Sequence, residues 1–172
     1  LATVLAARLL AEKAIEKIIL TRPAVEAGEN LGFLPGDLQQ KVDPYLKPLF
    51  DSLHSIFGSE KTNSLVDKGI IEIVPLAFMR GRTLEDSLII LDEAQNTTKS
   101  QMKMFLTRLG ERSKMIVNGD ITQIDLKDRN ESGLTEAINI FSNVEEIKFC
   151  YLTTEDIVRH SLVQKIVEAY KN

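Results

Sequence analysis

A run of four apolar residues that ends in two acids, within SLIILDEAQN, limits most strongly what this chain can fold into. Leu88 to Leu91 show no alternation of polar and apolar residues, so a strand here has to be buried on both faces. Strands of that kind belong to parallel sheets whose two faces are covered by helices. Asp92 and Glu93 follow where such a strand ends, so the two charges require an explanation of their own.

The rest of the chain alternates strand and helix patterns. Pro44 and Pro48 predict a break or kink in one of the helices. We expect one doubly wound α/β domain over residues 1–172, with a mainly parallel sheet and helices on both faces. The strands are expected at 15–21, 70–74, 87–92, 114–120 and 145–152, and the helices at 1–16, 37–57, 60–68, 98–109, 133–142 and 154–170.

The composition excludes several classes of protein. With 44% hydrophobic and 27% charged residues, the chain resembles an ordinary soluble protein, and no apolar run is long enough to cross a membrane. The one cysteine excludes an internal disulfide, which fits a cytoplasmic protein. The net charge of −4 argues against general affinity for nucleic acid, which would have to meet a local basic patch.

The acids at the strand end suit phosphoryl transfer. Ligands of a doubly wound sheet sit at the carboxyl ends of the strands. Asp120 ends the next strand candidate, and Gln123 follows three residues later. Phosphoryl transfer needs a carboxylate for Mg²⁺, a second one to orient water, and a polar group that senses the terminal phosphate. Asp92-Glu93 after four apolar residues fits the Walker B pattern, and NGDITQ fits a later sensor strand.

The loop that would hold the phosphates is not found in this sequence. A P-loop needs G-x-x-x-x-G-K-[ST], because glycine amides and one lysine wrap the phosphates. None of the nine glycines is followed by lysine. We expect the loop and its strand upstream of Leu1, and we expect the chain without them to bind nucleotide weakly or not at all.

A family resemblance is found in five segments: residues 20–49, 75–98, 101–110, 118–126 and 158–170. These segments resemble the PhoH-like proteins, which are phosphate-starvation-inducible P-loop ATPases. The resemblance extends over essentially the whole chain. The resemblance implies a RecA-like core similar to the motor domain of superfamily 1 helicases, an ATP-hydrolysing activity, and ATP and Mg²⁺ as cofactors.

The resemblance also implies roles for single residues. Asp92 matches the Mg²⁺-linked acid, and Glu93 matches the acid that activates water. Gln95 belongs to the same DEAQ motif, for which it implies a contact to the nucleotide or to the coupling machinery. Gln123 matches the sensor glutamine that reads the γ-phosphate, and Asp120 supports it.

Basic residues are the candidates for RNA and for assembly. Thr21 and Arg22 match a helicase-like motif that usually faces nucleic acid. Arg80 and Arg82, in a loop expected at the same sheet edge as the acids, suit phosphate or RNA backbone, although solvated loop arginines are the alternative. Arg159 is either an arginine finger in a homo-oligomeric ring or a salt-bridged surface residue.

Three functions remain open at this point. The first is an ATPase coupled to the movement or remodelling of RNA. The second is a Mg²⁺-dependent nuclease, which needs no phosphate loop but leaves Gln123 without a role. The third is an ATP-gated scaffold that assembles and catalyses little. The nuclease would use a cluster of four carboxylates, Asp92, Glu93, Asp120 and Asp125.

Overall fold

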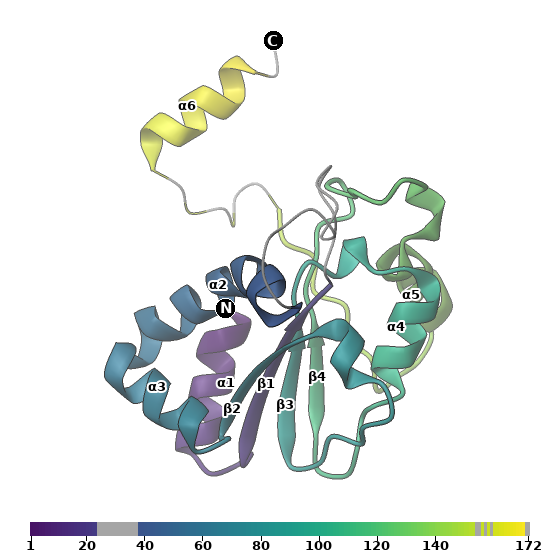
Figure 1. Ribbon diagram of the computed structural model, residues 1–172. Coiled ribbons are helices and arrows are strands. Elements are labelled where there is room, and N and C mark those ends of the chain that lie inside the picture. The colour runs from purple at the N-terminus through teal and green to yellow at the C-terminus, as the bar shows by residue number, and fades with distance from the viewer. Residues whose placement is uncertain (24–37, 154–155, 157, 159, 171–172) are drawn as a thin grey trace. The chain divides into compact units, whose positions relative to one another are not determined.

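A computed structural model describes residues 1–23, 38–153, 156, 158 and 160–170 (Figure 1). The chain divides into two compact units, Leu1–Ile140 and Phe141–Asn172. None of the helices in these described residues is long and apolar enough to cross a membrane.

The first unit is built on a sheet of four parallel strands. The strands are β1 (Lys17–Arg22), β2 (Ile71–Pro75), β3 (Ser87–Leu91) and β4 (Lys114–Val117), and their order in the sheet is β2-β1-β3-β4. Ile19 of β1 pairs with Ile89 of β3, which pairs in turn with Met115 of β4. All carboxyl ends therefore meet at one edge, as the doubly wound prediction requires.

Helices cover both faces of this sheet (Figure 1). Alternate residues of a strand point to opposite faces, so Ile18 and Leu20 pack under α1, α2 and α3, while Ile19 packs under η2, α4 and α5. Every residue of β3 is buried, which confirms the two-sided burial that its apolar run predicted. The elements are α1 (Ala2–Ala11), α2 (Leu38–Phe57), α3 (Ser59–Asp67), η2 (Leu76–Met79), η3 (Ala94–Asn96), α4 (Lys99–Leu106), η4 (Arg129–Glu131) and α5 (Gly133–Phe141).

A capping box begins the helix α4, because Thr98 Oγ1 accepts a hydrogen bond from the Gln101 backbone N–H while Gln101 Oε1 accepts from the Thr98 backbone N–H. Of the break or kink predicted at Pro44 and Pro48, the break does not occur, since α2 continues from Leu38 to Phe57 through both prolines. Leu49 and Leu53 of the same helix are buried against the sheet, and such packing outweighs the backbone preference of a proline.

The second unit, Phe141–Asn172, contains the helix α6 (Ser161–Ala169). The strand predicted over residues 145–152 is wrong, because these residues are irregular and exposed, with 70% of Tyr151 open to solvent. A strand is stable only beside another strand, and the described part of this unit contains none. The helix α6 is also shorter than the predicted one.

Candidate active site

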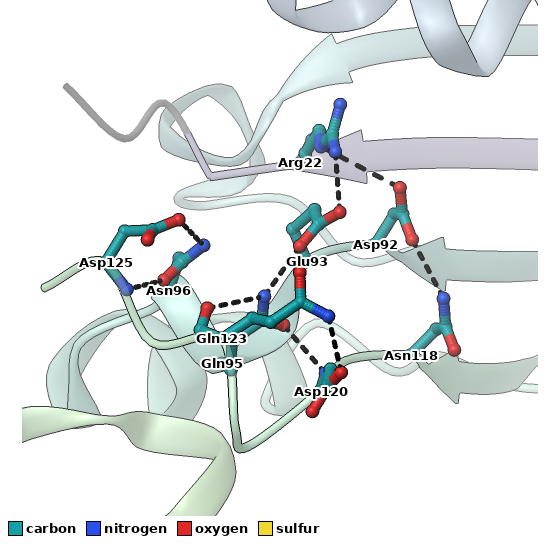
Figure 2. A network of polar contacts seen from close by, with 9 residues as sticks. All are labelled: Arg22, Asp92, Glu93, Gln95, Asn96, Asn118, Asp120, Gln123 and Asp125. Atoms are coloured by element: carbon teal, nitrogen blue, oxygen red, sulfur yellow. Dashed lines mark hydrogen bonds and ion pairs between the residues drawn. The ribbon is translucent and has the colours of Figure 1, made fainter. Parts of the chain in front are cut away.

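The carboxyl ends of β1, β3 and β4 bring Asp92 and Glu93 together with residues 118–123, which we call the sensor loop (Figure 2). The Asp92 N–H donates to the Thr21 carbonyl at 3.0 Å, which extends the β1–β3 pairing beyond the strands. On the other side, the Asn118 N–H donates to the Leu91 carbonyl at 2.8 Å, and the Ala94 N–H donates to the Asn118 carbonyl at 2.9 Å. Backbone hydrogen bonds therefore fix the turn that contains Asp92 and Glu93 between β1 and β4.

Glu93 has a left-handed backbone, with a φ of 54°. Few residues other than glycine adopt this conformation, and the strain is often stored at functional sites. Both of its carboxylate oxygens are hydrogen-bonded: Oε1 accepts from Arg22 Nη2 at 2.8 Å, and Oε2 accepts from Gln95 Nε2 at 2.6 Å. The carboxylate is thus held between the end of β1 and a residue of the following turn.

Arg22 contacts both Asp92 and Glu93, although its sequence motif predicted a position facing nucleic acid. Its Nε is 3.7 Å from Asp92 Oδ2, and only 20% of its side chain is exposed. Asp92 Oδ1 accepts from Asn118 Nδ2 at 2.9 Å, and Asn118 was not a predicted site residue. The position of Asn118 directly after an apolar strand was the signal that could have revealed it.

The sensor loop is organised around Asp120. Its Oδ1 accepts from the Thr122 hydroxyl at 2.6 Å and from the Thr122 amide at 2.8 Å, and its Oδ2 accepts from Gln123 Nε2 at 2.6 Å. These bonds, the Thr122 hydroxyl first, hold the pKa of Asp120 below its usual value of 3.8. The structure therefore brings Asp120 and Gln123 together as an ionised carboxylate and its amide donor.

Gln95 links the acids to this loop. It is 1% exposed, and its Nε2 donates both to Glu93 and to the Gln123 carbonyl, the latter at 3.2 Å. Its Oε1 accepts from the Asp120 N–H at 3.1 Å. A single buried amide thus contacts both the candidate general base and the sensor loop.

Asp92 is the residue that fits a magnesium ion. It is 24% exposed in its side chain, and Mg²⁺ is commonly held by one or two carboxylates together with water and phosphate oxygens. A larger carboxylate cluster is not formed: within the described residues, no group of three or more His, Cys, Asp or Glu could hold a metal ion. Asp125 is instead paired with Asn96, to which its N–H donates at 2.8 Å, so the nuclease hypothesis lacks its cluster.

The predicted nucleic-acid residues are scattered. Thr21 is fully buried, and within the described chain its hydroxyl has no hydrogen-bond partner. Arg80 is exposed, whereas Arg82 makes two bonds to Glu72 of β2, Nη2 to Oε2 being 2.7 Å. The expectation that this loop lies at the edge of the acids is wrong for Arg82, because the loop returns the chain from the end of β2 to the start of β3. Arg159 lies outside the described residues.

Comparison with known proteins identifies the family. The family model described as PhoH-like protein matches residues 1–171. The chain belongs to the PhoH-like family. It is 60% identical over 170 residues to the PhoH-like protein of Bacillus subtilis, covering 99% of this chain and 53% of that protein. It is also 47% identical over 167 residues to Protein PhoH of Escherichia coli, covering 96% of this chain and 47% of that protein.

A second PhoH-like protein, from Synechocystis, is 60% identical over 171 residues, with 99% of this chain and 52% of that protein covered. This chain therefore spans about half the length of the PhoH-like relatives it matches. The sheet with its two helical layers is the doubly wound α/β architecture predicted for this family.

Proposed function

We propose that this chain forms the core of a Mg²⁺-dependent ATPase that couples hydrolysis to the binding or remodelling of RNA. The observation that carries the proposal is the contact of one amide, that of Gln95, with both Glu93 and the sensor loop at Gln123. An acid that orients water and a group that senses the terminal phosphate have to act at the same place. Family membership supports the same conclusion.

Each side chain has a proposed task in hydrolysis. Asp92 holds Mg²⁺, which when bound neutralises charge on the phosphates. Glu93 accepts a hydrogen bond from the attacking water and takes its proton. Gln123 donates to the terminal phosphate, and Asp120 keeps the Gln123 amide in place through their bond of 2.6 Å.

The position of α1 supports a phosphate site at the same edge. The C-terminal end of α1 leads into the start of β1, so its N-terminal end lies towards the carboxyl edge of the sheet. The first turn of a helix has unpaired N–H groups and a positive dipole end, both of which attract phosphate. We propose that the phosphate loop, which the sequence lacks, comes from residues outside this chain and precedes α1.

RNA and assembly are further parts of the proposal. The exposed side chain of Arg80 is free to reach a phosphate backbone, whereas Arg82 is engaged by Glu72. Arg159 is proposed to act at a neighbour's nucleotide in a ring. The expected setting is the cytoplasm. An Arg80→Ala variant should weaken RNA binding while basal ATP hydrolysis stays unchanged.

The main test uses an extended protein, in which the chain is joined to the part of the Bacillus subtilis relative that lies outside the matched region. We expect this protein to hydrolyse ATP and RNA to stimulate it. Glu93→Gln should lower kcat by about 10²–10⁴-fold, the usual contribution of a general base. The control is Glu16→Gln, the same change at an exposed residue away from the site.

Other results would select the alternatives. Hydrolysis that is unchanged in Glu93→Gln would remove Glu93 from its role. Metal-dependent cleavage of RNA that is lost in Asp92→Ala would favour the nuclease. ATP-dependent oligomers with negligible turnover would favour the scaffold.

A further inference from the structure

We infer that Gln95 is a positioning residue that fixes the Glu93 carboxylate and transmits the position of the sensor loop to it. This inference rests on the proposed function, in which Glu93 acts on the attacking water. It assigns Gln95 no contact with the nucleotide, because the side chain is buried and directed to protein groups.

The hydrogen-bond pattern allows only one orientation of the Gln95 amide. Its NH₂ group faces two acceptors, the Glu93 carboxylate and the Gln123 carbonyl, and its oxygen faces a donor, the Asp120 N–H. An amide turned by 180° would oppose oxygen to oxygen twice and N–H to N–H once. Buried donors and acceptors without a hydrogen-bond partner destabilise the fold far more than exposed ones do, so the orientation of this amide is fixed.

The backbone around Gln95 is also fixed. The Ser132 hydroxyl donates to the Gln95 carbonyl at 2.8 Å, and both residues are buried. A Cβ added at Gly119 would lie 2.6 Å from Gln95 Oε1 and 3.0 Å from its backbone nitrogen. The loop backbone at Gly119 therefore passes directly against Gln95.

The two oxygens of Glu93 differ in what holds them (Figure 2). Oε2 is bound by the buried Gln95, and Oε1 is bound by the partly exposed Arg22. Oε1 can thus exchange its hydrogen bond to Arg22 for one to water, while the bond from Gln95 to Oε2 holds the orientation of the carboxylate. A shift of the sensor loop moves the Asp120 N–H and the Gln123 carbonyl. Because both groups are hydrogen-bonded to the Gln95 amide, the amide moves with them and changes the position of the Glu93 carboxylate.

The test compares Gln95→Glu and Gln95→Met in the extended protein. Gln95→Glu keeps the size and the acceptor for Asp120 but places a carboxylate against Glu93. Gln95→Met removes all three bonds. We expect kcat to fall about 10–100-fold in both, the usual cost of losing a group that orients a catalytic residue. The KM for ATP should stay within about twofold, and Asn63→Asp on the exposed side of α3 should change neither value.

A double-mutant cycle separates the two proposals. In a Glu93→Gln background, adding Gln95→Met should cause no further loss of kcat if Gln95 acts through Glu93. Independent losses that multiply, or a raised KM with an unchanged kcat, would overturn the inference while leaving the ATPase intact. An unaltered kcat in Glu93→Gln would instead overturn the proposed role of Glu93, and the inference with it.

Amide hydrogen exchange tests the contact between Gln95 and the sensor loop by a measurement that does not depend on catalysis. In the 172-residue chain, the Asp120 amide should exchange at least about tenfold faster in Gln95→Met, which removes its acceptor. It should stay protected in Gln95→Glu, which retains that acceptor. Equal exchange in Gln95→Met and the parent chain would overturn the coupling to the loop.

Discussion

Arg22 and Glu93 lie 71 residues apart in the sequence and form an ion pair in which Nη2 is 2.8 Å from Oε1. Adjacent parallel strands make this contact: Thr21 of β1 is in register with Leu91 of β3, so the residues that follow them meet at the sheet edge. The guanidinium also lies 3.7 Å from Asp92 and offsets the charge of both acids. A divalent cation at Asp92 therefore has to compete with an internal one.

Replacing this arginine should strengthen metal binding. In Arg22→Ala, the two carboxylates keep their charge but lose a nearby positive group, so Mg²⁺ or Mn²⁺ should bind roughly three- to tenfold more tightly. Titration of the 172-residue chain by calorimetry or by Mn²⁺ relaxation measures this. Arg8→Ala is the control, because Arg8 pairs with Glu12 on the exposed side of α1. Equal or weaker binding in Arg22→Ala would contradict the competition.

Gly119→Ala should destabilise the fold because the added methyl group would clash with neighbouring side chains. The added methyl group would meet Gln95 Oε1 at 2.6 Å and Leu134 Cδ2 at 2.7 Å, and such overpacking costs about 1–3 kcal/mol. Urea denaturation gives the free energy of unfolding. In Gly69→Ala the methyl meets nothing within 4 Å, so only its backbone strain, about 1 kcal/mol, should appear. Slow Asp120 exchange retained in Gly119→Ala would show that the loop tolerates the methyl.

The bidentate ion pair of Arg112 and Asp86 should make the stability of the fold depend on pH in the acidic range. The hydrogen bond from Arg112 lowers the pKa of Asp86, so this carboxylate contributes stability above its ordinary pKa of 3.8, which applies in the unfolded chain. That contribution is lost as the pH falls through the lower, folded pKa. Arg112→Gln should therefore melt below the parent chain at pH 7, with the difference vanishing in strong acid.

Thermal melts at pH 7, 4 and 2 measure this trend. Lys127→Gln, which removes the same charge from an exposed lysine, is the control. A difference between Arg112→Gln and the parent chain that stays constant down to pH 2 would exclude the Asp86 carboxylate as its source.

Removing the helix cap should cost about 1 kcal/mol. Thr98→Ala deletes the oxygen that accepts from the Gln101 N–H, which leaves a donor at the start of α4 unpaired. Thr83→Ala, at an exposed loop position, should change the unfolding free energy by less than about 0.5 kcal/mol. Urea unfolding curves measure both, and equal losses would show that the box does not stabilise α4.

Local patterns predicted most of the first unit. The apolar run of β3 is short and unbroken, and burial on two faces is the one environment that suits it, so the sheet type followed. The segment 145–152 has a similar apolar content, but it is irregular, because a strand depends on a neighbour that its own residues do not specify. Likewise, the prolines of α2 carry a local preference that packing against the sheet overrides.

The sequence by itself determined the alternation of strands and helices, the capping box, and the presence of acids after β3, because each depends on residues within one or two turns of each other. Only the tertiary structure decided that Arg22 pairs with those acids and that Gln95 is buried between Glu93 and Gln123. The physical reason is that a polar side chain binds whichever donor or acceptor the neighbouring strand presents. The order of the strands in the sheet, which decides that neighbour, does not follow from the spacing of residues along the chain.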